Sequence, residues 1–423
     1  MKRIVFLIGF FLLSVVCNCQ DFNKYFIDKT LRVNYLHIGN SDLDSISLAD
    51  FYAGGRWNGT RSHLVEKNRL GDVLVEVFDS LSNVLIFSRS YSCLFNEYRT
   101  TERALLETAA FEESVNIPFP KSSVKIAFTS FDRKHKAQKL YECYFNPETT
   151  GYKQFVKEYK TVDLHIGGSS DTCIDILFLP DGYSLDDKKL MKNDLKRFAS
   201  YIMKCSPYKE YKNRVNIRAV KAYSPQSGIT DPNQGVFKQT ILNTSYNTID
   251  VDRYLMCLNV WKMHDIADDA PYDMLVILAN SPKYGGGGIY NFYATVNNHH
   301  TNSDYVVVHE LGHLIAGLAD EYYTSEVSVT DYYPEGVEPV EPNVTTLVDF
   351  DSKWKNMLDV KTPVPTPTTE NYANVLGVYE GGGYVAEGVY RPWLHCTMKE
   401  IRYDAFCPVC SKALIDAFLY FSK

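Results

Sequence analysis

Hydrophobic and polar residues alternate along the first part of the chain, which is the pattern of strands buried on one face. Residues 73–78 and 84–87 follow it on either side of a polar turn and predict a hairpin. Residues 124–128 and 140–145 predict two further strands. No helical period dominates here, so we expect an all-β sandwich over residues 20–155. Such an accessory domain either binds substrate or a cell surface, or serves only folding and spacing.

Beyond this sandwich the pattern changes to continuous apolar runs combined with helices. Residues 173–180 and 272–279 predict strands buried on both faces, and residues 185–204 predict an amphipathic helix. A polar stretch at residues 146–151 separates the two patterns and is typical of a linker. We therefore expect a second domain, of the α/β (α+β) class, over residues 160–423.

Apolar residues also surround the motif H-E-L-G-H at residues 309–313. Residues 305–308 before it are apolar, and Gly317 after it is a natural helix stop, so we expect a buried helix. Ser303 and Asp304 are candidates for its N-terminal cap.

H-E-x-x-H on a helix is typical of a zinc peptidase. His309 and His313 lie four residues apart, so both imidazoles can reach one metal ion. Glu310 lies beside them, where its carboxylate can take a proton from water at the metal. The competing interpretation is a helix with two hydrogen-bonded core histidines. Histidine and glutamate, however, are uncommon in a core of valines and leucines that has only a packing role, which argues against this interpretation.

The third ligand of a catalytic zinc site must come from outside this helix. Asp320 is the first candidate and Glu321 the second, while a distant His or Glu stays open. The spacing H-E-x-x-H-x-x-x-G-x-x-D resembles the longer metzincin motif, with one residue inserted before the glycine. Metzincins also place a methionine turn beneath the metal, and Met398 is the candidate here.

Longer segments resemble the igalysin family of secreted bacterial zinc peptidases, named for a member that cleaves IgA. They are H-E-L-G-H-L-I-A-G-L-A-D-E-Y-Y from residue 309, E-G-G-G-Y-V-A-E-G-V-Y-R-P-W-L-H-C-T-M from residue 380 and F-C-P-V-C from residue 406. The resemblance covers about residues 160–423 and includes the segment 174–183. It implies that zinc is held by the two motif histidines and Asp320, with Glu310 as the base. The resemblance does not imply that IgA is the substrate of this chain.

The N-terminus predicts export. Two positive residues precede an apolar run over residues 4–16, which is too short to span a membrane and indicates a signal peptide over residues 1–19. Cleavage after Cys19 is one interpretation, and a lipoprotein anchored through Cys17 or Cys19 is the alternative. We expect a periplasmic, cell-surface or secreted protein that touches a membrane only if it is lipid-anchored.

Eight of the ten cysteines remain after such cleavage, and an exported protein can pair them. A disulfide from Cys396 to Cys407 or Cys410 would pin the Met398 turn under the metal. The C-x-x-C spacing of the last two also occurs in redox motifs and structural zinc sites. We rank these lower, because neither a thioredoxin-like context nor a second pair of matching spacing is present.

The composition and charge of the chain limit the classes of partner that we expect it to bind. The chain has 423 residues, of which 45% are hydrophobic, enough for two domains with real cores. Loss of the two basic residues at positions 2 and 3 takes the formal charge from −7 to −9. A net-acidic chain without basic runs argues against nucleic-acid partners.

Three further segments are candidates for the walls of a substrate-binding cleft. The glycines at residues 285–288 and the run that follows fit an edge strand that binds extended substrate. Residues 324–370 are a proline-rich irregular insertion, and residues 380–388 are a glycine-rich lid or wall. Tyr403 and Arg391 are weak candidates for an oxyanion donor and a substrate contact.

Together these features predict a secreted zinc-dependent endopeptidase that cleaves an extracellular protein or glycoprotein. The alternative is a non-catalytic surface-binding protein in which zinc only holds the fold. An intact Glu310 argues against that alternative, because a structural site needs no base.

Overall fold

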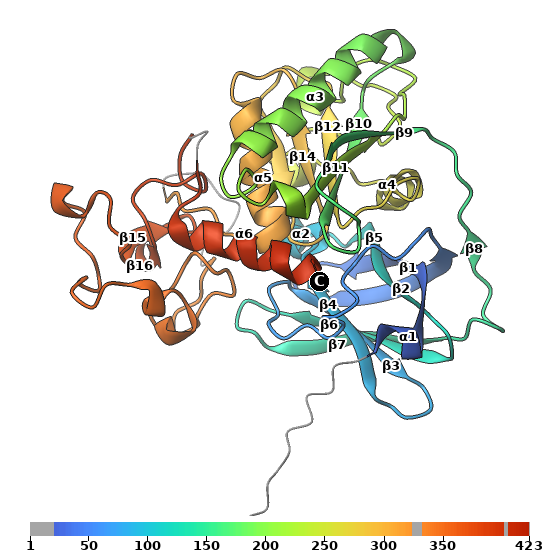
Figure 1. Cartoon of the computed structure of the whole chain (residues 1–423), viewed down its shortest axis with the longest axis horizontal. Coiled ribbons are helices and arrows are strands. Elements are labelled where there is room, and N and C mark those ends of the chain that lie inside the picture. The colour runs from blue at the N-terminus through green and yellow to red at the C-terminus, as the bar shows by residue number, and fades with distance from the viewer. Residues whose placement is uncertain (1–20, 324–331, 402–404, 423) are drawn as a thin grey trace, which may run out of the picture.

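The computed structural model describes residues 21–323, 332–401 and 405–422. The predicted signal peptide, with its two cysteines, and the candidate Tyr403 lie outside these residues. Sheets and helices are mixed, and the N-terminal part is rich in β-strands (Figure 1). Within the described ranges, no helix is both long and apolar enough to cross a bilayer.

Two four-stranded sheets form the N-terminal part, in the orders β5-β1-β2-β8 and β4-β3-β6-β7. Their elements are α1 Phe22–Tyr25, β1 Phe26–Gly39, β2 Asp44–Ala53, β3 Val73–Asp79, β4 Leu85–Tyr91, α2 Leu94–Tyr98, β5 Ala109–Pro120, β6 Val124–Phe131, β7 Ala137–Phe145 and β8 Lys153–Gln154. The predicted hairpin is confirmed, because β3 and β4 pair antiparallel. Ring centroids of Tyr35 and Phe128 lie 5.2 Å apart, and those of Phe51 and Phe145 lie 5.0 Å apart. These pairs join the two sheets face to face, as a sandwich requires.

A six-stranded sheet follows, in the order β13-β14-β12-β10-β11-β9. Its strands are β9 Thr161–Ile166, β10 Ile174–Asp181, β11 Val215–Val220, β12 Met274–Ala279, β13 Gly286–Gly288 and β14 Tyr293–Asn297. The four inner strands are parallel, and both edge strands run antiparallel to their neighbours. Every residue of β10 and β12 is buried, as the continuous apolar runs predict for strands covered on both faces.

Helices and the N-terminal sheets cover the two faces of this sheet. The longer helices are α3 Lys188–Lys204, α4 Val260–Ala267, α5 Ser303–Ala316 and α6 Pro408–Phe421. Phe178 and Val276 share one core with α3, α5 and α6. Leu177 and Leu275 point to the opposite face, because side chains alternate along a strand, and share a core with α4 and the N-terminal sheets. One hydrophobic core therefore runs without a break from the N-terminal sheets into the six-stranded sheet.

Between α5 and α6 the chain forms a lobe to one side of the sheets, coloured orange to red in Figure 1. The described part of the predicted insertion is irregular, with three single 3-10 turns: η6 Phe350–Ser352, η7 Lys355–Met357 and η8 Glu370–Tyr372. The glycine-rich segment that we expected as a lid or wall is an antiparallel hairpin, β15 Tyr379–Gly382 and β16 Val385–Arg391.

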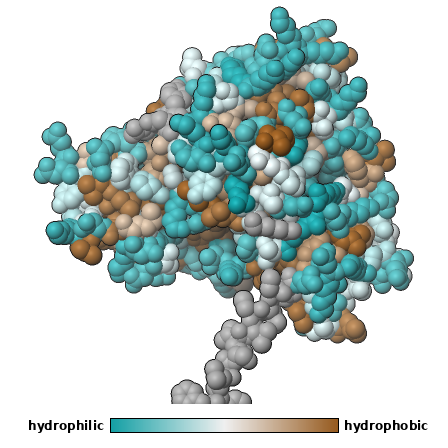
Figure 2. Space-filling view, viewed as in Figure 1, coloured by the Kyte–Doolittle hydropathy of each residue, from teal (hydrophilic) through white to brown (hydrophobic). Residues whose placement is uncertain are grey.

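Helix α6 returns from the lobe and reaches the N-terminal part, where the chain ends (Figure 1). The Tyr420 hydroxyl donates to the His63 carbonyl at 3.0 Å, and the two rings stack with centroids 5.2 Å apart. On the face shown in Figure 2, hydrophilic residues dominate and hydrophobic ones form small, separate groups.

Candidate metal centre

Helix α5 carries the two motif histidines and is buried almost all round. It begins at Ser303 with Asn302 as its N-cap, one residue before the predicted cap, and no side chain bonds to its first turn as a cap. It ends at Gly317, as predicted, where a left-handed φ of 58° lets the N–H bond back to Gly312 and His313 carbonyls. The chain then turns back toward the helix.

The two imidazoles face each other, with Nε2 atoms 3.1 Å apart. The other ring nitrogens are occupied: His309 Nδ1 lies 3.0 Å from the Thr397 carbonyl oxygen, and His313 Nδ1 lies 2.5 Å from that of Leu318. A carbonyl can only accept, so each Nδ1 carries the hydrogen. In each ring Nε2 is therefore the nitrogen left to bind a metal ion, and the two Nε2 atoms lie at the same point.

Asp320 lies at the same point as the two Nε2 atoms. Its Oδ1 atom lies 3.0 Å from His309 Nε2 and 3.4 Å from His313 Nε2, while the Tyr384 hydroxyl donates to Oδ2. Oδ1 is buried, and the two imidazole nitrogens are the contacts recorded for it. A buried carboxylate oxygen beside two imidazole lone pairs needs a cation, and a His2Asp set fits a zinc ion with an open position.

The same carboxylate controls the protonation of the histidines. Burial alone would lower the pKa of His313, but the negative charge of Asp320 raises it to about 9. The pKa of His309 is raised in the same way against the effect of burial. A metal ion must displace these protons, so metal affinity falls as the pH falls.

Glu310 lies on the side of the centre that faces β13. A Cβ on Gly286 would lie 3.3 Å from Glu310 Oε1, and a Cβ on Gly288 would lie 3.1 Å from Oε2. The ligand atoms of Glu310 and of the two histidines lie within 4.8 Å of one another. Burial raises the pKa of Glu310, which makes its carboxylate a stronger base than an exposed one.

Glycine is needed in β13 because the strand touches the metal-site helix directly. A Cβ on Gly288 would lie 2.5 Å from the backbone oxygen of Glu310, and one on Gly287 would lie 2.4 Å from the Tyr254 ring. Both distances are shorter than real Cβ contacts, so a side chain would push the strand away. The predicted place of this glycine run at a sheet edge is confirmed, since β13 is the first strand of the sheet.

Met398 packs against helix α5 at Gly312, the residue before the second motif histidine. Its Sδ atom lies only 2.7 Å from an ideal Cβ on Gly312, so the glycine in the middle of the motif makes room for it. Its backbone oxygen accepts from the Glu321 N–H at 2.8 Å. The preceding carbonyl, that of Thr397, is the acceptor for His309. This turn therefore supports the centre from below.

Glu321, the second candidate for the third ligand, faces away from the imidazoles. Its Oε1 atom lies 3.1 Å from Cys410 Sγ and accepts from Asn343 at 3.0 Å. The predicted disulfide is not formed: Cys396 and Cys410 sulfurs lie 3.8 Å apart, and the described cysteines are free. That distance is well beyond the ~2.05 Å of a sulfur–sulfur bond.

Two further candidates lie away from the reaction centre. Arg391 is 2% exposed and donates to the carbonyls of Glu380 and Gly381, so the expected substrate contact is wrong and this residue instead holds the β15–β16 hairpin. His395 pairs with Glu400 at 2.6 Å on the surface.

Sequence reasoning missed the groups that position the ligands. Tyr384 bonds to Asp320, and Gly383 N–H donates to the Asp320 backbone oxygen at 2.8 Å. Tyr305 donates to the Thr397 carbonyl at 3.0 Å and lies 3.2 Å from His309 Nδ1. A backbone acceptor has no sequence signal. The only signal for Tyr384 was its place in a segment already singled out by the resemblance.

The centre opens into a cavity of about 810 Å³. Its walls include both histidines, Glu310 and β13, together with side chains from the loops and helix α2 of the N-terminal part, among them Arg69, Glu97 and Arg133. The N-terminal part is thus one wall of the space in front of the metal ligands.

Comparison with known families agrees with this division of the chain. The family model described as IgA Peptidase M64 matches residues 162–375 and 368–418, and one described as Peptidase M64 N-terminus matches residues 21–142. A search of curated proteins found no match.

Proposed function

Since the chain belongs to the IgA peptidase M64 family, it is a metallopeptidase that acts on protein or peptide, and we propose that it is a secreted zinc endopeptidase with a metzincin-like catalytic domain over residues 160–423. The observation that carries the proposal is the buried Asp320 oxygen beside the Nε2 atoms of His309 and His313, with Glu310 at their side and a large cavity in front.

The residues divide the chemistry between them. Zinc held by His309, His313 and Asp320 would supply Lewis acidity, which polarises the scissile carbonyl and makes the attacking water more acidic. Glu310 accepts the proton of that water on a carboxylate oxygen while the water oxygen bonds to the carbonyl carbon. It then returns the proton to the nitrogen as the carbon–nitrogen bond breaks.

We expect both the N-terminal part and the C-terminal part of the chain to contact the substrate. Arg133, in the β6–β7 turn, donates to the Tyr332 carbonyl at 3.0 Å, and its guanidinium lies 4.0 Å from that ring's centroid. This contact joins the N-terminal part to the lobe across the cavity. Of the two roles left open for the N-terminal domain, substrate contact is supported by its share of the cavity wall.

The test is metal content and peptide-library cleavage of the wild type and Glu310→Gln. We expect both proteins to hold zinc at this centre and only the wild type to cleave. Glu387→Gln is the matched control, because Glu387 is exposed on β16 away from the centre. Equal cleavage by Glu310→Gln and the wild type, or a His313→Ala variant that loses no zinc relative to the wild type, would contradict the proposal.

A further inference from the structure

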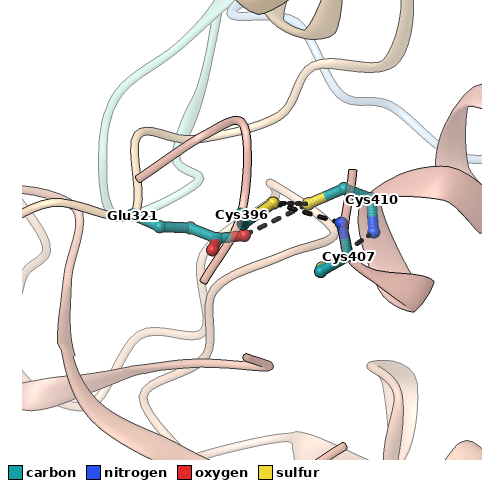
Figure 3. Close-up of side chains that lie close together, drawn as sticks. All are labelled: Glu321, Cys396, Cys407 and Cys410. Atoms are coloured by element: carbon teal, nitrogen blue, oxygen red, sulfur yellow. Dashed lines mark hydrogen bonds between the residues drawn. The ribbon is translucent and has the colours of Figure 1, made fainter. Parts of the chain in front are cut away.

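Four buried side chains meet at the start of α6: Glu321, Cys396, Cys407 and Cys410 (Figure 3). Their ligand atoms all lie within 4.8 Å of one another. They come from three separate places, namely the residue after Asp320, the turn before Met398 and the start of α6. The exposure of each is 3% or less.

The sulfur atoms lie as thiolate ligands would. Cys407 is the N-cap of α6, and its Sγ atom accepts from the Cys410 N–H at 3.4 Å. Cys396 Sγ accepts from the Cys407 N–H at 3.3 Å. Backbone N–H groups at a helix N-terminus favour the thiolate form, which is the form that binds metal.

A cluster of cysteine thiols without a metal ion does not explain why Glu321 is buried here. It is fully buried, and its Oε2 atom has no hydrogen-bond partner. Among the described residues, no lysine or arginine lies within ion-pair distance of it, and the more distant charge of Arg391 only partly offsets the cost of burying its carboxylate. A carboxylate with an unpaired oxygen is costly to bury, so this position indicates a bound cation.

We propose that these four residues hold a second metal ion, a structural zinc site of three thiolates and one carboxylate. The distance of 3.8 Å between Cys396 and Cys410 sulfurs matches the ~3.8 Å edge of a tetrahedron built on zinc–sulfur bonds of ~2.3 Å. The C-x-x-C spacing of Cys407 and Cys410 is the usual chelating pair of such sites. Four protein ligands leave no open position, so the site is structural.

The second site would brace the first. Glu321 follows Asp320 directly, and its N–H donates to the Met398 carbonyl at 2.8 Å. Cys396 immediately precedes Thr397, whose carbonyl orients His309. A metal ion on Glu321 and Cys396 therefore fixes both backbone segments that position the ligands of the first centre.

The test is zinc stoichiometry of the full chain by elemental analysis. We expect two zinc ions in the wild type, one in His313→Ala, one or fewer in Cys407→Ser and two in the control Cys143→Ser, whose cysteine lies on β7. Cobalt loaded into His313→Ala should give sulfur-to-cobalt charge-transfer absorption. Because His313→Ala empties only the first centre, failure of the proposed peptidase site and failure of this one are distinguishable.

A disulfide is the outcome that would overturn the proposal. We expect Cys396, Cys407 and Cys410 to resist alkylation in the native protein and to become reactive after a chelator removes zinc. Mass spectrometry that finds Cys396 joined to Cys407 or Cys410, or His313→Ala that binds no zinc, would contradict it. The alkylation experiment uses the wild type, so it decides the question even if Cys407→Ser does not fold.

Discussion

At the scale of the residue, the Tyr384 hydroxyl is the group that holds Asp320 in place. Tyr384→Phe removes that hydrogen bond while keeping the ring. Partners of this kind typically contribute about 10–100-fold to metal affinity, so we expect zinc to bind more weakly by a factor in that range. Competition with a chromogenic chelator measures the affinity, and activity should recover when zinc is in excess.

The control for this change is Tyr144→Phe, which alters an exposed tyrosine on β7. It should leave zinc affinity unchanged. An affinity of Tyr384→Phe equal to that of the wild type would show that Asp320 needs no help from the hairpin.

A second residue-scale feature lies in the N-terminal sheets. His37 is buried between Asp44, at 2.7 Å, and Glu113, at 3.1 Å. Its ring also stacks on Phe95 and lies 3.7 Å from the Cys93 sulfur. Burial would lower the pKa of His37, but the two carboxylates raise it to about 9 from its usual 6.5.

This shift predicts the pH dependence of stability. A histidine with a raised pKa stabilises the fold fully below pH 6.5, and that contribution is lost as the pH rises through about 9. The melting temperature of the wild type should therefore fall over this window more steeply than that of His37→Gln. Calorimetry from pH 6 to pH 10 on both proteins is the measurement, and parallel curves would refute the buried charge.

The sequence predicted those site residues whose chemistry is carried by side chains at a fixed helical spacing. His309, Glu310 and His313 needed only the period of an α-helix. Asp320 could be ranked ahead of Glu321 but not chosen outright, because neighbouring residues in an irregular segment point in directions that only the turn after Gly317 sets. The carbonyl of Thr397 could not be predicted, since every residue has one.

At the scale of the element, strand β13 packs so closely against helix α5 that it has no room for a side chain. Gly288→Ala would bring a Cβ within 2.5 Å of the Glu310 backbone oxygen. We expect a loss of about 1–3 kcal/mol in stability, as for overpacked cores, and a fall in kcat because Glu310 shifts. Gly151→Ala is the control, since a Cβ there meets nothing within 4 Å. Denaturant titration and kinetics report the two effects separately.

Elements with a strong period were predicted well, and the β15–β16 hairpin was not. Strand β10 and helix α3 follow long apolar or amphipathic runs, and both lie where expected. The hairpin has a glycine-rich sequence with little alternation, and its burial comes from contacts with the Asp320 segment. Tertiary contacts of this kind leave no local pattern to read.

At the scale of the whole molecule, the continuous core makes the two parts dependent on each other. Leu177 and Leu275 of the six-stranded sheet share their core with the N-terminal sheets. A chain that starts at residue 157 would expose this face to water, so we expect it to lack a cooperative thermal transition. A truncated chain that melts cooperatively at the wild-type temperature would show that the N-terminal part is only a spacer.

The cavity between the two parts also decides what kind of cutting the protein can do. The two histidines and Glu310 line a space whose other walls come from β13, the lobe and the N-terminal part. If this is the site of cleavage, we expect a bond held inside a compact folded domain to be out of its reach. Only a strand-like stretch, such as a hinge or a linker between domains, can thread past these walls. Digestion of a native multidomain substrate should therefore stop at a few large, stable fragments rather than continue to short peptides.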